Sequence, residues 1–183
     1  MYNEVIEKML QFNKAFVENK SYDAFVTDKY PDKKIAIVAC MDTRLTHLLP
    51  AALGLKNGDV KMIKNAGAQL ISPYDSVMKS IMVGVYELGV TDVMVIGHDA
   101  CGVQGLKSED MLELMKKRGI TEEAIEKVSA ECNLNEWLNG FEEINASVMS
   151  AVTMIKEFPL LPADLNVYGF VMDPVTGAVR AAE

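Results

Sequence analysis

Two near-continuous apolar runs, rich in β-branched residues, constrain the fold of this chain most. They are residues 34–40 (KIAIVAC) and 91–98 (TDVMVIGH); between them, residues 60–68 (VKMIKNAGA) read as a further strand that ends in a glycine turn. Such apolar runs are typical of strands buried on both faces of a parallel sheet. Because helical patterns separate these strands, we predict an α/β fold with a mainly parallel β-sheet flanked by helices.

Helix signals lie between and around the predicted strands. In residues 72–89, Ser72 is a candidate helix cap, Pro73 suits the first turn and Gly89 suits the end. The other expected elements are a helix or turn at 45–55, a mostly helical region at 109–158 with breaks near Gly119 and at 133–139, and a strand, turn and short return at 166–180.

The first predicted helix, residues 2–19, carries an apolar face. Val5, Met9, Phe12 and Phe16 fall on one side of it by their spacing. Such an apolar face is expected to pack on another surface, which could be the chain's own sheet or another subunit.

Length and charge narrow the class of protein. At 183 residues, half of them hydrophobic, the chain is expected to form one domain over residues 1–183. The net charge of −8 argues against nucleic acid as a partner, since phosphate binding needs clustered Lys and Arg. No apolar run reaches the roughly 18 residues that span a bilayer, and the acidic start is unlike a signal peptide. We therefore expect a cytoplasmic protein without a membrane partner, whose cysteines are reduced.

Possible metal ligands follow two of the predicted strands. Cys40 ends the first strand, while His98 and Cys101, in the segment GHDACG, follow the third. Reactive groups gather at the carboxyl ends of parallel strands, so these side chains are expected to meet at one edge of the sheet. Thiolate and imidazole suit Zn²⁺, and three protein ligands leave one tetrahedral position open, as in catalytic sites. We predict one Zn²⁺ per chain, with Gly97 and Gly102 letting the backbone pass close to it.

Two charged residues follow Cys40 in the segment CMDTR. Asp42 and Arg44 are two positions apart, so in an extended segment they point the same way, and an arginine fork pairs well with a carboxylate. Zn²⁺ with two thiolates is nearly neutral, so its bound water should be less acidic than water on three histidines. We expect Asp42 to orient this water or hydroxide as a nucleophile for a small electrophilic carbon, with activity rising toward alkaline pH.

These motifs together resemble those of the β-class carbonic anhydrases. CMDTR is similar to that family's Cys-x-Asp-x-Arg motif, GHDACG to its His-x-x-Cys motif, and KNAGA (64–68) to its Arg-Asn-Ala-Gly-Asn segment. The resemblance covers residues 34–105 by motif and is greatest to the compact bacterial and archaeal branch. The chain departs from the pattern at Lys64, where the family has arginine, and at Ala68, where it has asparagine. Both departures bear on the shape of the substrate pocket.

The resemblance implies an enzyme that hydrates CO₂ reversibly to bicarbonate and a proton. Matched residue by residue, it implies that Cys40, His98 and Cys101 are zinc ligands. It also implies that Asp42 and Arg44 form a dyad that orients a zinc-bound hydroxide. A homodimer or higher homo-oligomer, with active sites near the subunit interface, is implied as well.

Two other functions fit the same residues. A carbon disulfide hydrolase would use the same zinc site on a related linear molecule. A redox or zinc-sensing module would join Cys40 and Cys101 in a disulfide and would have no turnover. The Asp42–Arg44 pair argues against sensing as the sole role, because sensing needs no carboxylate aimed at the metal.

Several polar residues near the motifs have less specific interpretations. His47 is a candidate proton shuttle or a structural residue, and Asp99 is expected to face solvent or cap a turn. Cys132 has no partner motif and is interpreted as a small apolar residue. The segment Asn65–Gly67 is expected to shape the turn behind the site.

Overall fold

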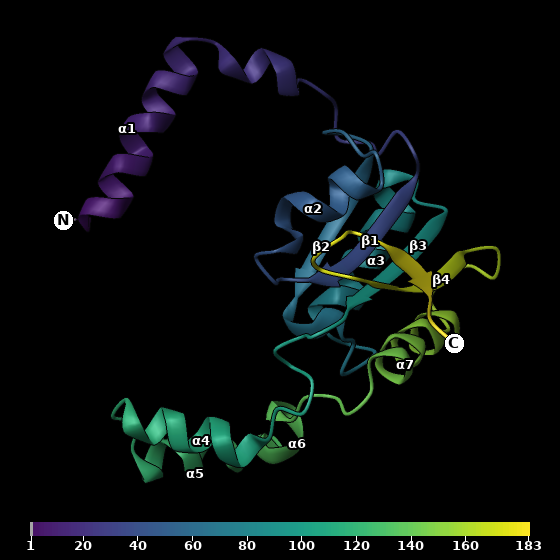
Figure 1. The fold of residues 1–183 in the computed structure, drawn as a ribbon. Coiled ribbons are helices and arrows are strands. Elements are labelled where there is room, and N and C mark those ends of the chain that lie inside the picture. Colours follow the sequence, from purple (N-terminus) through teal and green to yellow (C-terminus); the bar gives the residue numbers. More distant parts are fainter. Residues whose placement is uncertain (1) are drawn as a thin grey trace.

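The protein is described over residues 2–183 by a computed structural model, shown as a ribbon in Figure 1. Within these residues the strands are β1 (Ile35–Cys40), β2 (Val60–Asn65), β3 (Asp92–His98), β4 (Asn166–Met172) and β5 (Val179–Ala181). The α-helices are α1 (Glu4–Glu18), α2 (Leu45–Ala52), α3 (Ser76–Leu88), α4 (Ser108–Lys117), α5 (Glu122–Ser129), α6 (Leu134–Leu138) and α7 (Ile144–Lys156). Two short 3-10 segments complete the list, η1 (Ser21–Phe25) and η2 (Ala66–Ala68).

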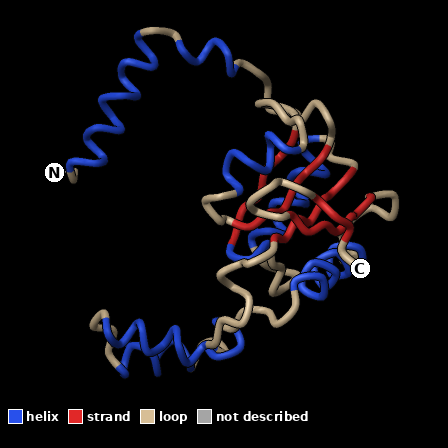
Figure 2. Tube along the Cα trace, in the orientation of Figure 1, coloured by secondary structure: helices blue, strands red, loops and turns tan. Residues whose placement is uncertain are grey.

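The strands form one sheet in the order β2-β1-β3-β4-β5, seen as a single group in Figure 2. β1 pairs in parallel with β2 and β3, and β3 with β4, whereas β5 runs antiparallel to β4. Helix α3 contacts β1 and β2, and α7 contacts β3 and β4. The predicted α/β fold with a mainly parallel sheet is confirmed.

The two most apolar runs of the sequence occupy the centre of the sheet. Residues 36–39 of β1 are at most 1% exposed, and Val93, Val95 and Ile96 of β3 are fully buried. β2 lies at an edge and has no buried residue. Its lysines, Lys61 and Lys64, suit an edge strand, because charged side chains discourage pairing with another chain.

Gly97 of β3 and Gly169 of β4 allow α7 to approach the sheet closely. A β-carbon on Gly97 would lie 2.7 Å from Ile144 Cδ1 and 2.8 Å from Val148 Cγ2, and one on Gly169 would lie 2.9 Å from Val148 Cγ1. Gly97 therefore serves the packing of α7 on β3, a role that its sequence did not indicate. Its predicted role in letting the backbone pass close to a metal stays a prediction. A β-carbon on Gly102 would meet nothing within 4 Å, so the packing of the protein itself does not require glycine there.

The helix predicted at 72–89 begins later than its sequence suggests. α3 starts after Asp75, whose carboxylate accepts hydrogen bonds from two N–H groups of the first turn. Ser72 lies in the preceding turn, where its hydroxyl accepts from a backbone N–H two residues on. A carboxylate is a stronger acceptor than a hydroxyl and also favours the positive end of the helix dipole. Gly89 ends the helix in the left-handed conformation, φ 71°, as predicted.

The helical region between β3 and β4 contains α4 to α7. Gly119 follows α4 with φ 90°, which agrees with the predicted break. The second predicted break, at 133–139, instead holds the short helix α6, because the Asn133 side chain caps its first turn. No helix within residues 2–183 has both the length and the apolar character to cross a membrane.

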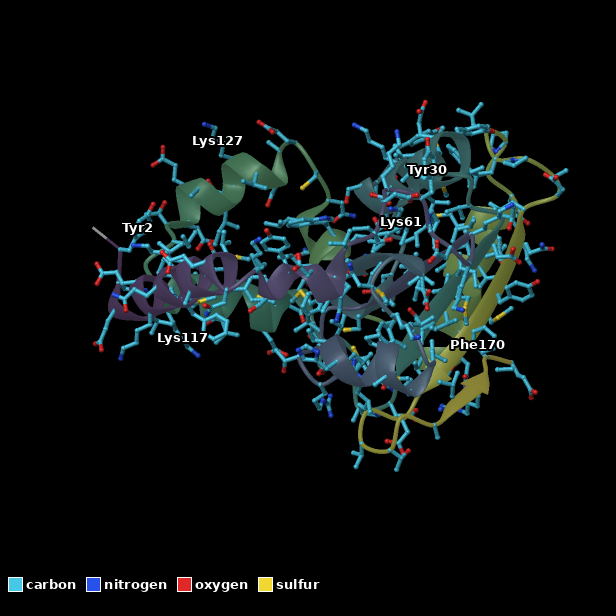
Figure 3. All side chains as sticks on the ribbon, turned by 90° about the horizontal axis from the view of Figure 1, so that it is seen from above. Tyr2, Tyr30, Lys61, Lys117, Lys127 and Phe170 are labelled. Carbon is cyan, nitrogen blue, oxygen red and sulfur yellow. The ribbon has the colours of Figure 1, made fainter. Side chains whose placement is uncertain are left out.

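Helix α1 and the α4–α6 segment extend away from the sheet on the same side of the molecule. In the view of Figure 3, Tyr2, Lys117 and Lys127 lie at one end and Phe170 of β4 at the other. Neither α1 nor α5 contains a buried residue. The chain's own sheet therefore leaves the apolar face of α1 uncovered, although this sheet was one of its two expected partners.

We expect Gly97→Ala to lower the free energy of unfolding by about 1–3 kcal/mol, because the added methyl group overpacks the contact with α7. Chemical denaturation of the metal-free protein measures this change. Gly102→Ala is the matched control, with an expected change below about 0.5 kcal/mol. Equal stabilities of Gly97→Ala and wild type would contradict the close packing of α7 on β3.

Candidate metal centre

The carboxyl ends of β1 and β3 lie next to each other at the centre of the sheet. Ala39 pairs with Ile96 in the parallel register, so Cys40 and His98 leave the sheet side by side. After β1 the chain continues to β2, which lies on one side of this pair, and after β3 it continues to β4, which lies on the other side. A crevice opens at such a switch point in α/β sheets. The topology itself thus brings the two motifs together.

Cys40, His98 and Cys101 form a compact, buried group. One ligand atom from each lies within 4.8 Å of the others, and the two Sγ atoms are 3.9 Å apart. The three residues are 4%, 0% and 7% exposed, and both thiols are free. The predicted convergence of these side chains is confirmed.

The imidazole of His98 is oriented by the backbone. Its Nδ1 lies 2.9 Å from the carbonyl oxygen of Asp99, and because a carbonyl only accepts, Nδ1 carries the proton and donates it. Its Nε2 is buried and has no hydrogen-bond partner among the described residues. A buried nitrogen without a partner is costly, and a metal ion held with Cys40 and Cys101 would satisfy it. Two thiols and one imidazole are a donor set that fits Zn²⁺.

The surroundings of Cys40 favour its thiolate. Burial raises the pKa of this thiol, but the imidazole of His98 and the backbone N–H groups of Asp42 and Gly67 lower the pKa more, to about 7. Burial raises the pKa of Cys101, while the neighbouring Cys40 raises the pKa of His98. The thiolate is the form that binds a metal. The backbone amides around Cys40 therefore prepare one of the two sulfurs for this role.

The turn after β2 supplies one of these amides. Gly67 adopts φ 76°, a left-handed conformation in which a β-carbon would also lie 3.1 Å from the ring of Phe141. The N–H of Met41 donates to the carbonyl of Asn65 at 2.8 Å, which ties the turn to the end of β1. The segment Asn65–Gly67 thus shapes the strand-end turn, as expected. Its amide near the Cys40 thiol has no signal in the sequence.

Asp42 and Arg44 form a bidentate ion pair at the rim of the group. Arg44 donates from Nε to Oδ1 at 3.0 Å, from Nη2 to Oδ2 at 2.7 Å, and from its backbone N–H to Oδ1 at 2.8 Å. Oδ2 of Asp42 lies 3.8 Å from Nε2 of His98, too far for a hydrogen bond. The hydrogen bonds from Arg44 hold the pKa of Asp42 well below its usual range, against a smaller effect of burial. The carboxylate is therefore ionised at neutral pH and can only accept.

Three other polar residues lie away from the group or have roles that the sequence did not indicate. His47 is exposed on α2. Cys132 is exposed between α5 and α6, so its interpretation as a small apolar residue is wrong. Asp99 faces solvent, as expected, with its side chain 44% exposed, and its carboxylate also accepts two hydrogen bonds from Arg180 of β5. A single arginine on the last strand carries no local pattern that links it to a motif 81 positions earlier.

A cavity of 320 Å³ is lined by the turn that follows β2 and by the segment that follows Cys101. Asn65 and Ala66 of the strand-end turn form part of its wall, and Val103, Leu106 and Trp137 form apolar parts. Apolar walls of this kind suit a small molecule without charge.

Known proteins resemble this chain in sequence and in structure. A family model described as carbonic anhydrase matches residues 35–179. YtiB of Bacillus subtilis, named as a candidate carbonic anhydrase, is 48% identical over 174 residues, which cover 94% of this chain and 93% of YtiB. A carbon disulfide hydrolase of Acidithiobacillus thiooxidans is 22% identical over 161 residues, or 81% of this chain and 77% of that protein. A β-carbonic anhydrase crystal structure from Trichomonas vaginalis has a TM-score of 0.89 at 32% identity, covering 100% of this chain and 98% of that one.

We expect Cys101→Ala to weaken Zn²⁺ binding by more than about 100-fold, since changes that leave the ligands in place already cost about 10- to 100-fold. Competition with a chromophoric chelator measures the affinity. Cys132→Ala removes an exposed thiol away from the group and is the matched control, with wild-type affinity expected. Tight zinc binding by Cys101→Ala would remove this sulfur from the metal centre.

Proposed function

The chain belongs to the carbonic anhydrase family, and from this premise we propose that residues 1–183 act as one zinc-dependent domain that hydrates CO₂ reversibly to bicarbonate and a proton. As a carbonic anhydrase, the protein is a lyase. The observation that carries the proposal is the buried group of Cys40, His98 and Cys101, in which Nε2 of His98 has no partner among the described residues.

In this proposal Cys40, His98 and Cys101 hold one Zn²⁺ per chain, as two thiolates and a neutral imidazole. Bound there, Zn²⁺ would supply a Lewis acid and an open position at which the pKa of water falls. Thiol ligands need a reducing compartment to stay available, which supports the cytoplasm as the proposed location.

Asp42 is proposed to orient the reacting water. Its Oδ1 accepts two hydrogen bonds from Arg44, whereas Oδ2 accepts one and lies on the side of His98. Oδ2 therefore keeps a lone pair for a water at the centre. An ionised carboxylate can only accept hydrogen bonds, so a water held there turns its hydrogen to Asp42 and a lone pair toward the carbon of CO₂. Arg44 maintains this role by holding Asp42 ionised.

Sequence identity and the residues of the site favour CO₂ hydration over carbon disulfide hydrolysis and zinc sensing. The carbon disulfide hydrolase is 22% identical to this chain, against 48% for YtiB. A zinc sensor would have no use for a carboxylate held by two arginine nitrogens beside the metal ligands. Rates of CO₂ hydration and carbon disulfide hydrolysis, measured on one preparation, separate the two enzyme functions.

We expect Asp42→Asn to keep its zinc and to lose about 10²- to 10⁴-fold in CO₂ hydration, the usual contribution of a positioned acid–base group. The amide turns an N–H toward the site where an acceptor is needed, and its ion pair with Arg44 is lost. Stopped-flow hydration with metal analysis of the same sample measures both quantities. Asp75→Asn is the control, because asparagine also caps α3. Unchanged hydration by Asp42→Asn would remove Asp42 from the mechanism.

We further propose that the protein is a homo-oligomer of at least two chains. A single chain exposes 11926 Å². A compact monomer of 20.2 kDa exposes about 8,700 Å². The excess of about 3,000 Å² per chain is large enough for a permanent interface, which buries about 2,000–5,000 Å² in total over both partners.

Helix α1 accounts for part of this excess. Its Val5, Met9 and Phe12 are 65%, 62% and 74% exposed in the single chain. A helix of 15 residues that contacts the short η1 segment and buries none of its residues is marginal in water, so this apolar face needs a partner surface. Two cavities that share Tyr74, one lined by residues of α7 and the other by Trp137, offer such a surface on a second copy.

We expect Phe12→Glu to shift the protein toward monomer, because a charge on the apolar face opposes its burial. Gln11→Glu introduces the same charge on the polar side of α1 and should leave the assembly unchanged. Sedimentation velocity at several concentrations compares the three proteins. A monomeric wild type, or a Phe12→Glu variant with wild-type mass, would contradict the proposed role of α1.

A further inference from the structure

A second bidentate ion pair lies on the other side of the metal-ligand loop from Asp42 and Arg44. Arg180 of β5 donates from Nη1 to Oδ2 of Asp99 at 2.9 Å and from Nη2 to Oδ1 at 2.8 Å. The two side chains are about half exposed, at 49% and 44%. Two parallel hydrogen bonds fix both the position and the orientation of the carboxylate.

Asp99 connects this pair directly to His98. Its carbonyl oxygen accepts the hydrogen bond from Nδ1 of His98 at 2.9 Å, and its own N–H donates to the carbonyl of Met172 on β4 at 3.0 Å. The side chain, carbonyl and N–H of Asp99 are thus each held by a different group. Any rotation of the 99–100 peptide, to which this carbonyl belongs, would carry the acceptor away from Nδ1.

The loop from His98 to Cys101 is held from both sides. Arg44, which follows β1, donates from Nη2 to the carbonyl of Ala100 at 3.0 Å, and Arg180 reaches Asp99 from β5. Between these contacts Ala100 has φ 50°, a conformation that costs energy for a residue with a β-carbon. Such a conformation persists only where neighbouring contacts enforce it. The two arginines are the side chains that make those contacts.

We propose that Arg180 is a positioning residue for the metal centre: through Asp99 it fixes the carbonyl that keeps the proton of His98 on Nδ1 and leaves Nε2 free for Zn²⁺. This inference rests on the proposed function only in that His98 is a zinc ligand. Arg180 acts on the metal through two intermediates and touches no reacting group. A hydrogen bond to the second nitrogen of a histidine ligand sets its tautomer and ring orientation, and its loss costs about 10- to 100-fold in metal affinity.

The rival interpretation is an ordinary ion pair that stabilises the end of β5. Ion pairs with this exposure contribute little to folding. The rival therefore predicts a small loss of stability and no change in the metal centre. The proposal predicts the opposite, namely faster loss of the metal and no loss of stability. Metal retention and stability, measured separately, therefore distinguish the two interpretations.

The experiment uses the full chain in its zinc-loaded form. Arg180→Met removes the guanidinium and keeps the aliphatic stem, while Arg180→Lys keeps the charge with a single point of contact. Asp99→Asn keeps the backbone carbonyl but replaces the carboxylate by an amide, a weaker acceptor for Arg180. Lys116→Met is the matched control, because Lys116 makes a comparable exposed pair with Glu122 at 2.9 Å on α4 and α5. The readouts are the rate of zinc release to a chelator, the visible spectrum of the Co²⁺-loaded protein, and the unfolding midpoint of the metal-free protein.

We expect Arg180→Met and Asp99→Asn to release zinc about 10- to 100-fold faster than wild type and to alter the Co²⁺ spectrum. Arg180→Lys should fall between them and wild type, and Lys116→Met should match wild type. The metal-free midpoints of all these variants should agree with that of Lys116→Met. The double variant Arg180→Met with Asp99→Asn should release zinc no faster than the faster single variant, because both act through one contact.

Wild-type zinc release by Arg180→Met and Asp99→Asn would overturn the inference, as would multiplied effects in the double variant. If Arg180→Met does not fold, Asp99→Asn and Arg180→Lys decide the question by the same readouts. A wild-type protein that binds no zinc would instead overturn the proposed function. The two failures are therefore distinguishable in a single series.

Discussion

The parallel pairing of β1 with β3 is the constraint on which the rest of the site depends. This register sets Cys40 beside the end of β3, and the switch in strand order opens the crevice in which His98 and Cys101 join it. A slip of one residue would turn Cys40 to the other face of the sheet. The geometry of the site therefore depends on residues that do not line it. These are the buried apolar residues of the two central strands and the glycines that let α7 pack closely on β3 and β4.

Neighbouring charges and hydrogen bonds give each polar group around the metal centre a distinct role. Backbone amides and an imidazole surround the Cys40 sulfur, so a buried thiol is prepared to lose its proton. Arg44 holds a carboxylate ionised a few ångströms away, while the same guanidinium anchors the loop that carries Cys101. In our proposals one arginine supports the acceptor for the reacting water, and Arg180 supports the imidazole. Both act from the rim, where a half-exposed guanidinium keeps its hydration and its charge.

The sequence predicted the features that depend on neighbouring residues. Apolar runs gave the strands, and CMDTR with GHDACG gave the five candidate site residues, because each motif is local and the α/β pattern brings strand ends together. The features it missed depend on distant contacts. Gly97 faces a helix that begins 47 positions later, Arg180 lies on a strand whose pairing no motif records, and the Gly67 amide needs the register of β2. Ser72 was the predicted cap of α3, and only the hydrogen bonds show that Asp75 caps this helix instead.

The central claim is that a single metal ion, held by chain-distant thiols and one imidazole, makes this chain an enzyme. The most direct measurement is stopped-flow CO₂ hydration on metal-free protein to which zinc is added in steps, with bound metal determined at every step. We expect no hydration above buffer without zinc, a linear rise as zinc is added, and a plateau at one zinc per chain. Full activity of the metal-free protein, or no activity at one bound zinc per chain, would contradict it.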